Sequence, residues 1–252
     1  MKIYVQSRGF SQDYDYCWLP EVPPILRQYR ISDVIQSESP SVVLGRYDNK
    51  LLLLVTGLEA SERVDFQGRR IRNSVAWVGE DSEANEQKLR AIAAYSLRGL
   101  LDTDVDKAVQ FGGEFGFEVA FDTISHLKID EVRHFDAKLE SKIGRNSEYL
   151  RNDIAYEIEE RRLPKGNGFN NIPLVVVTGI KSANALKQAN VWRGLSNLVQ
   201  GEGWLEPYKK SYPSEPALAS SNQTPQKNNS LVFTLLLIAV IPVAMILFLF
   251  IR

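Results

Sequence analysis

The sequence predicts an α/β or α+β domain with a mixed β-sheet, followed by one C-terminal transmembrane α-helix. Strand and helix patterns alternate through residues 1–205, a stretch rich in Pro, Ser and Asn fills 206–230, and an uncharged apolar run fills 231–251. The chain has 252 residues, a formal net charge of −1 and 44% hydrophobic residues. This composition is typical of globular proteins and excludes a disordered chain. Because no basic surplus is present, we expect no nucleic-acid partner.

The strand patterns are short and several are joined by turn residues. Asp48-Asn49 and Gln67-Gly68 each separate two β-rich runs, which predicts two hairpins. The run Leu-Val-Val-Val-Thr at 174–178 is typical of a central strand that is covered on both faces. The predicted strands are 2–6, 41–46, 51–56, 63–66, 70–78, 115–121 and 174–178.

Four segments have the 3.6-residue apolar spacing of helices that pack on a sheet. Ser82 or Asp81 is placed to cap the first helix, and Ser147 is placed to cap the third. The last one, with Leu186, Trp192 and Leu195 on one side, reads as a single long helix before Gly201. The predicted helices are 83–101, 103–111, 147–162 and 182–200.

The C-terminal run from Leu231 to Ile251 contains no charged residue. A helix of this length spans about 31 Å, which matches a bilayer core of about 30 Å. Pro242 lies near its middle and predicts a modest kink. The sequence therefore predicts a membrane-spanning helix whose simplest role is an anchor.

The segment 206–230 lacks apolar periodicity and predicts a flexible linker between domain and anchor. The N-terminus has no signal-peptide pattern, since polar and charged residues interrupt any apolar region. We therefore expect a single-pass, tail-anchored protein whose N-terminal domain, residues 1–205, lies in the cytoplasm. Lysines on the near side of the span agree with this orientation.

A candidate anion-binding site lies where the strand at 174–178 meets the following helix. Thr178 and Gly179 precede Lys181 and Ser182, and free backbone N–H groups at a helix start attract anions. The alternative is an ordinary strand-to-helix turn in which Ser182 caps the helix. The turn lacks the spacing of a P-loop.

A second candidate group is the arginine cluster on the second hairpin, where Arg70 and Arg72 share one strand face. Arg63 and Arg69 lie nearby in sequence. Clustered guanidinium groups bind phosphate or carboxylate. The alternatives are a solvated strand face or a surface facing anionic headgroups.

Other patterns carry weaker signals. His126 and His134 have acidic neighbours, Asp130, Glu131 and Asp136, but their spacing matches no metal signature. Cys17 has no histidine near it in sequence, which argues against a nucleophilic role. The glycines at 112, 113 and 116 follow a helix and precede a strand, so they predict a helix stop and a tight turn. The aromatic residues of 10–19 form a half-buried strand or, if exposed, a recognition surface.

Two functions remain open on this sequence. The first is a non-enzymatic adaptor, sensor or regulatory module that binds a cytosolic protein partner at the bilayer, for instance in a stress or defence system. The second is a membrane-tethered enzyme or binding domain for a phosphate- or carboxylate-bearing small molecule. We assign no catalytic residue, no metal and no cofactor. The second function requires the turn at 178–182 and the arginine hairpin to converge on one concave pocket.

The predicted anchor can be tested by deleting residues 231–252. We expect the truncated protein to move from the membrane to the soluble fraction with its circular dichroism spectrum retained, because the domain would keep its own core. If the truncated protein stays with the membrane, residues 231–252 are not the sole membrane anchor.

Overall fold

The fold comes from a computed structural model that describes residues 1–36, 38–130, 132–166 and 168–205. The predicted linker at 206–230 and the predicted span, with Leu231, Pro242 and Ile251, lie outside these described residues. No helix within the described ranges is long and apolar enough to cross a membrane.

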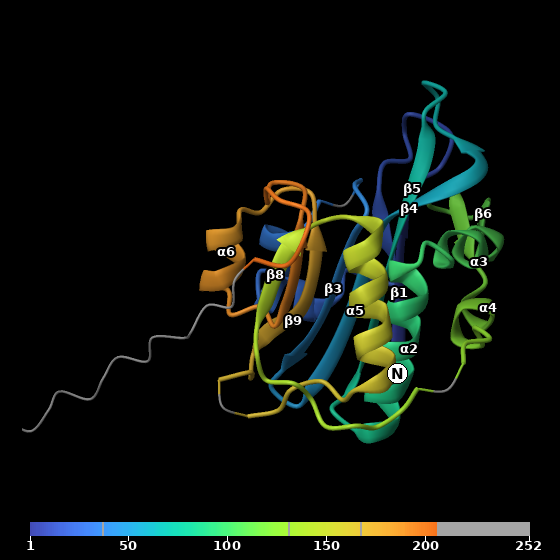
Figure 1. Cartoon of the computed structure of the whole chain (residues 1–252). Helices are drawn as coiled ribbons and strands as arrows, with labels where there is room; N and C mark the ends of the chain where they lie inside the picture. Colours follow the sequence, from blue (N-terminus) through green and yellow to red (C-terminus); the bar gives the residue numbers. More distant parts are fainter. Residues whose placement is uncertain (37, 131, 167, 206–252) are drawn as a thin grey trace, which may run out of the picture. The chain divides into compact units, whose positions relative to one another are not determined.

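The domain is built on a mixed eight-stranded sheet with the order β2-β1-β5-β4-β3-β9-β10-β8, which confirms the predicted α/β class and mixed sheet (Figure 1). Strands β2 to β3 in this order form an antiparallel half, and β9, β10 and β8 form a parallel half. The two halves join where β3 pairs antiparallel with β9. The strands of this sheet are β1 (Lys2–Ser7), β2 (Cys17–Leu19), β3 (Ser41–Tyr47), β4 (Lys50–Val64), β5 (Arg70–Glu80), β8 (Lys142–Arg145), β9 (Ile172–Thr178) and β10 (Arg193–Ser196).

Helices cover both faces of the sheet (Figure 1). On one face, α2 and α5 bury their apolar stripes against the sheet, with α3 and α4 beside them. On the other face, α1 and the short 3-10 helix η1 cover the antiparallel half, and α6 covers the parallel half. The helices are α1 (Pro24–Gln28), η1 (Ile31–Val34), α2 (Glu83–Leu97), α3 (Leu101–Ala108), α4 (Phe121–Ser125), α5 (Glu148–Glu160) and α6 (Ala183–Gln188).

The central strands are apolar on both faces because both faces are covered. In β4, Leu51 and Leu53 point to the α2/α5 side, whereas Leu52 and Leu54 point to the α1 side. All four are almost fully buried. The run at 174–178 behaves in the same way in β9, as predicted for a strand between two helical layers.

The predicted helix over 182–200 is wrong in its second half. Helix α6 ends at Gln188, and Asn190 takes a left-handed backbone conformation with φ of 54°. The chain then forms β10 between β9 and β8. Trp192 and Leu195 are buried as expected, but Leu195 lies in β10 and Trp192 directly before it, not on a helix. An Asn in the left-handed region ends a helix at little cost. The apolar residues beyond it therefore belong to a strand and its flanks, not to a helix.

Smaller differences surround the glycine-rich stretch. Helix α2 ends at Leu97, and Gly99 takes a positive φ of 73°. Helix α3 starts two residues earlier than predicted, at Leu101, and ends at Ala108. Strands β6 (Val109–Phe111) and β7 (Phe117–Val119) then form a separate hairpin around the glycines. Ser82 and Ser147 cap α2 and α5 as predicted, each accepting a backbone hydrogen bond.

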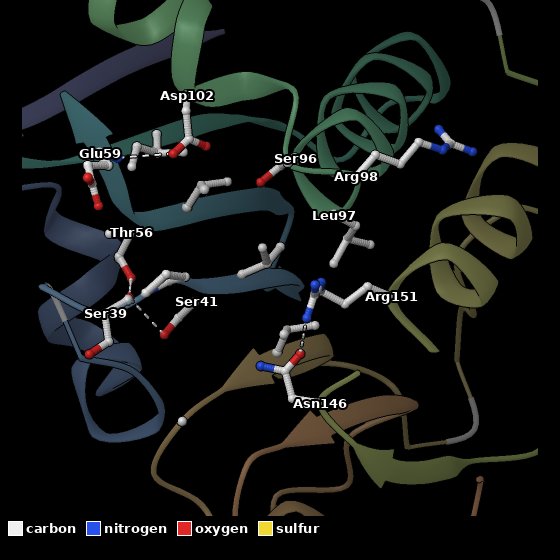
Figure 2. Close-up of a pocket in the computed structure, with 18 of the residues that line it drawn as sticks. Ser39, Ser41, Thr56, Glu59, Ser96, Leu97, Arg98, Asp102, Asn146 and Arg151 are labelled. Carbon is white, nitrogen blue, oxygen red and sulfur yellow. Dashed lines mark hydrogen bonds between the residues drawn. The ribbon is translucent and has the colours of Figure 1, made fainter. Parts of the chain in front are cut away.

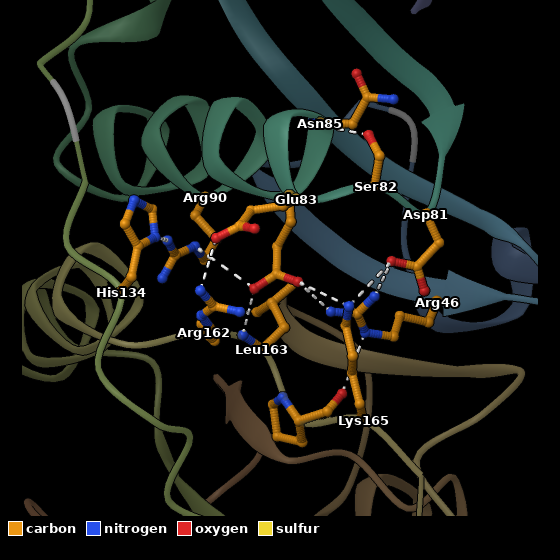
Figure 3. A network of polar contacts seen from close by, with 12 residues as sticks. Arg46, Asp81, Ser82, Glu83, Asn85, Arg90, His134, Arg162, Leu163 and Lys165 are labelled. Atoms are coloured by element: carbon orange, nitrogen blue, oxygen red, sulfur yellow. Dashed lines mark hydrogen bonds and ion pairs between the residues drawn. The ribbon is translucent and has the colours of Figure 1, made fainter.

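A buried charge network fixes the start of α2 against the sheet (Figure 3). The Arg46 side chain of β3 forms ion pairs with Asp81 and with Glu86, and its Nε donates to the carbonyl oxygen of Pro164 at 3.1 Å. The other oxygen of Glu86 accepts the Leu163 backbone N–H at 2.9 Å. Burial lowers the pKa of Arg90, while Glu86, whose Oε1 lies 3.8 Å from its Nε, opposes that shift. Strand β3, helix α2 and the segment before β9 are therefore held together.

The described chain ends alongside the edge strand β8. The Leu205 N–H donates to the carbonyl oxygen of Ile143 at 2.8 Å, and Trp204 forms an antiparallel bridge with Gly144. The Trp204 indole N–H donates to Asp153 of α5 at 2.8 Å. A Cβ on Gly144 would lie 3.3 Å from the Trp204 ring and 2.7 Å from Leu150, so glycine permits this close packing.

Gly57 offers a stability test, because β4 bulges there and its φ is +72°. A Cβ at this position would lie 2.3 Å from the backbone of Ser39 and Pro40, whereas Gly68, with φ of +76°, has open space around it. Both Gly→Ala variants strain the backbone, but only Gly57→Ala adds a collision. We expect a loss of about 1–2 kcal/mol in the free energy of unfolding for Gly68→Ala and more than about 3 kcal/mol for Gly57→Ala.

Urea denaturation followed by tryptophan fluorescence measures both variants of the full chain in one detergent. Equal losses in the two variants would show that the chain at Ser39 and Pro40 moves away without cost.

Candidate functional site at the carboxyl ends of the parallel strands

A cleft opens where the three parallel strands end. Asn146, Gly179 and Asn197 are the first residues after β8, β9 and β10, and all three line a cavity of about 670 Å³. The connection leaving β8 runs to α5 on one face, and that leaving β9 runs to α6 on the opposite face. A crevice forms at the carboxyl ends of strands where successive connections diverge in this way. The strand topology therefore places this cleft.

One wall comes from the start of β3 and the bulge of β4. The Ser41 hydroxyl donates to the Ser39 carbonyl oxygen at 3.3 Å. The Thr56 hydroxyl lies 2.8 Å from the same oxygen and 2.9 Å from the carbonyl oxygen of Gln36. Figure 2 shows these three hydroxyl-bearing residues side by side. The bonds of Thr56 hold Gln36 and Ser39 against β4 and shape the wall.

The first turns of α5 form the opposite wall. Ser147 caps the helix by accepting the Leu150 N–H, and the helix continues for 13 residues. Arg151 is half-buried and donates from Nη1 to the Asn146 side-chain oxygen at 2.9 Å (Figure 2). Glu148, in the first turn of the same helix, is exposed at the rim. A guanidinium and a helix start thus lie side by side on this wall.

The end of α2 and the start of α3 close the cleft. Arg98 lines the cleft, but its guanidinium donates to both carboxylate oxygens of Glu159. The hydrogen bond and the charge of Glu159 raise the pKa of Arg98 against a smaller effect of burial. The Arg98 guanidinium is therefore paired with α5 and does not point free into the cleft. Asp102 accepts the backbone N–H of Glu59 at 3.0 Å and so fastens α3 to β4.

The floor of the cleft is aliphatic and its walls are polar. Five aliphatic side chains come from β3, β4, β9 and α2: Val42, Val55, Leu58, Leu97 and Val177. Among the described residues, neither histidine, nor the cysteine, nor any aromatic side chain lines this cavity. The cleft offers hydrogen bonds, charges and apolar area, but no ring on which a planar ligand could stack.

No protein-family model, curated protein or solved structure matches this chain. The site must therefore be interpreted from its own geometry.

The structure brings part of the two predicted anion-binding groups together. Gly179 and Arg72 both line the cleft, although they come from opposite halves of the sheet. Arg72 is also the cross-strand neighbour of Glu59 and pairs with it at 2.5 Å. Arg70 lies 3.4 Å from the same carboxylate and donates to the Ala60 carbonyl oxygen, outside the residues that line the cleft.

The remaining predicted residues lie beside the cleft rather than in its wall. Thr178 is fully buried, and its hydroxyl oxygen accepts the Ile180 N–H. Ser182 caps α6, which has only six residues, by accepting the Ala185 N–H. Lys181 does not line the cavity. This turn therefore has the geometry of the alternative interpretation, an ordinary strand-to-helix connection with a serine cap.

Arg63 and Arg69 do not both lie on a solvated strand face, as one of the alternatives predicted. Arg63 is buried and donates to Ser7 at 3.2 Å and to Asn73 at 2.8 Å. Arg69 is exposed and pairs with Asp65 at 2.7 Å. Although burial acts in the opposite direction, hydrogen bonds from Arg69 and from the Gln67 N–H lower the pKa of Asp65. These contacts fix the tip of the β4–β5 hairpin.

The histidines and the cysteine are spread over other parts of the fold. His126 contacts Asp122 and Ser125 at the end of α4, and His134 lies 3.2 Å from Arg90. Burial and the charge of Asp15 raise the pKa of Cys17, which favours the unreactive thiol. Within the described ranges, no three His, Cys, Asp or Glu side chains are grouped to hold a metal ion.

Sequence reasoning missed Asn146, Arg151, Asn197 and Asp102. Three of these depend on β8 and β10, which the sequence patterns did not predict, because residues that follow an unrecognised strand look like ordinary loop residues. An asparagine directly follows β8 and β10, and a polar residue at the end of a parallel strand is the signal that would have found Asn146 and Asn197.

Proposed function

We propose that this chain is a membrane-tethered sensor or regulatory module that binds a phosphate- or carboxylate-bearing small molecule in the cleft. One observation carries the proposal: Asn146, Gly179 and Asn197 meet at the ends of three parallel strands beside the half-buried Arg151. Guanidinium and amide N–H groups are the donors that oxyanions prefer. The cavity, at about 670 Å³, also has the size of small-molecule sites.

The hydrogen bonds of the wall hydroxyl groups favour a site that binds a ligand without converting it. Ser41 and Thr56 donate to backbone carbonyl oxygens, whereas an activated nucleophile donates to a base such as histidine or a carboxylate. Among the described residues, the lining contains no histidine or cysteine, and its carboxylates, Glu59, Asp102 and Glu148, accept no hydrogen bond from these two hydroxyl groups. We therefore favour recognition of a ligand over its conversion.

The tether is the second part of the proposal and rests on the sequence of 206–252. The apolar run from Leu231 to Ile251 would anchor the chain, and the Pro-rich segment before it would let the domain move. Such an arrangement raises the concentration of the domain near membrane-bound partners without adding contacts. The domain would face the cytoplasm, as the lysines on the near side of the apolar run suggest.

The cleft can be tested with two substitutions that change charge in opposite directions. Arg151→Gln removes the guanidinium, so we expect the affinity for inorganic phosphate and for succinate to fall about tenfold or more. Glu148→Gln removes a carboxylate at the rim, so we expect affinity for the same anions to rise about two- to fivefold at low salt. Amide chemical shifts of Asn146, Gly179 and Asn197 in the full chain report binding.

Arg133→Gln is the matched control, because Arg133 is an exposed arginine outside the cleft, and its affinity should equal that of the wild type. If none of the three wild-type amides changes its chemical shift at millimolar phosphate or succinate, the proposed site is refuted.

A second candidate function, docking of a cytosolic protein partner, is favoured by exposed aromatic residues. Phe10 and Phe111 are 55% and 44% exposed and contact each other edge to face, with ring centroids 6.3 Å apart. Phe111 also lies over the buried Arg63, 5.7 Å from its guanidinium carbon. Exposed aromatic pairs held in place from below are typical of protein-binding surfaces.

A photoreactive phenylalanine at position 111 tests this candidate in cells. We expect one discrete crosslinked product at 111 and none at Leu139, which is similarly exposed, at 53%, but is placed elsewhere. Identical patterns at the two positions would argue against a dedicated docking surface.

A further inference from the structure

The charges of the cleft are separated between its two ends. Figure 2 shows Asp102 and Glu59 at one end, and Arg151 with Asn146 at the other. Asp102 and Glu59 are also linked directly, since the Glu59 N–H donates to the Asp102 carboxylate. Arg151 and Asn146 share a hydrogen bond in the same way. Each end of the cleft is thus a pair of residues joined by a hydrogen bond.

The sheet order explains this separation. Glu59 belongs to β4, whereas Asn146 follows β8, and strands β3, β9 and β10 lie between them. Four inter-strand spacings of about 4.8 Å put β4 about 19 Å from β8, and the Arg151 side chain reaches into this span from α5. The aliphatic floor, with Val42 and Val177 on β3 and β9, lies between the two ends.

The two carboxylates at the acidic end are not equivalent. Glu59 is neutralised by Arg72 at 2.5 Å and by Arg70 at 3.4 Å. Within the described part of the chain, Asp102 forms no ion pair, and its one hydrogen bond comes from a backbone N–H. Asp102 is half-buried and lines the cleft. A carboxylate in this position favours a cationic donor on the ligand.

The basic end has the opposite character. Within the described residues, the Arg151 side chain makes one hydrogen bond, to Asn146, so the other donors of its five-donor guanidinium can meet an acceptor on the ligand. Glu148 lies at the same end, but it is exposed at the rim while Arg151 is half-buried. Solvent screens the exposed carboxylate more strongly than the half-buried guanidinium.

We infer that the ligand of this cleft is a zwitterion, with a carboxylate or phosphate on Arg151, a protonated amine on Asp102 and an aliphatic chain across the floor. This inference rests on the proposed function and deepens it by naming the class of ligand. Lack of an aromatic side chain in the described lining agrees with an aliphatic rather than a planar ligand.

The test compares ω-amino acids with the simple carboxylic acids of the same chain length, from two to six carbons, titrated into the full chain in detergent. We expect one length of amino acid to bind about tenfold or more tightly than its matching acid, the gain of one charge-assisted hydrogen bond. In Asp102→Asn, which keeps an oxygen for the Glu59 N–H, that preference should disappear while binding of the acids persists. Asp104→Asn, on the same helix but outside the cleft, should retain the preference.

The outcomes separate the inference from the proposed function. Equal affinity for amino acids and acids at every length overturns the zwitterion alone and leaves an anion site. A preference that survives in Asp102→Asn also overturns it. If neither the amino acids nor the acids bind, both the zwitterion and the proposed function of the cleft are overturned.

Discussion

Coverage of both faces of one mixed sheet is the constraint on which the rest of the structure depends. The runs Leu51–Val55 of β4 and Leu174–Val177 of β9 are buried from both sides, and all of their side chains are apolar. Buried polar groups are costly unless they are paired, and the sheet therefore leaves polar side chains mainly to the ends of its strands. The cleft at Asn146, Gly179 and Asn197 is such a place. Its polar walls and aliphatic floor both follow from this division.

The helices that wall the cleft are held by charges as well as by apolar packing. Glu86 and Arg46 fix the start of α2 against β3, while Arg98, just after α2, pairs with Glu159 of α5. Arg193 of β10, fully buried, pairs with Glu157 of the same helix. Breaking a buried pair leaves one charge without compensation, which is far more costly than losing an exposed pair. These ion pairs therefore hold the walls of the cleft in place, which the proposed selection of a ligand by the position of its charges would require.

The sequence predicted those parts of the fold in which local pattern and tertiary role agree. Both hairpins, the central strand β9 and the serine caps of α2 and α5 follow the predictions closely. Strand β8, Lys-Ile-Gly-Arg, has one apolar side chain, and its glycine is there for the packing of Trp204. Strand β10 has the apolar spacing of the preceding helix, and only Asn190 marks the change. Since Arg151, Asn146 and Asn197 take their places from these two strands, the local pattern predicted Gly179 and Arg72 but not the residues that accompany them.

The short stretch at Gly203–Leu205 has a consequence for contacts between copies of this chain. Exposed sheet edges pair readily with the edges of neighbouring molecules. Here β8 is shielded by Trp204 and Leu205, and the opposite edge, β2, has only three residues. Both edges thus offer a neighbour little backbone to pair with. Copies of the described domain are therefore protected at both edges from aggregating through their sheets.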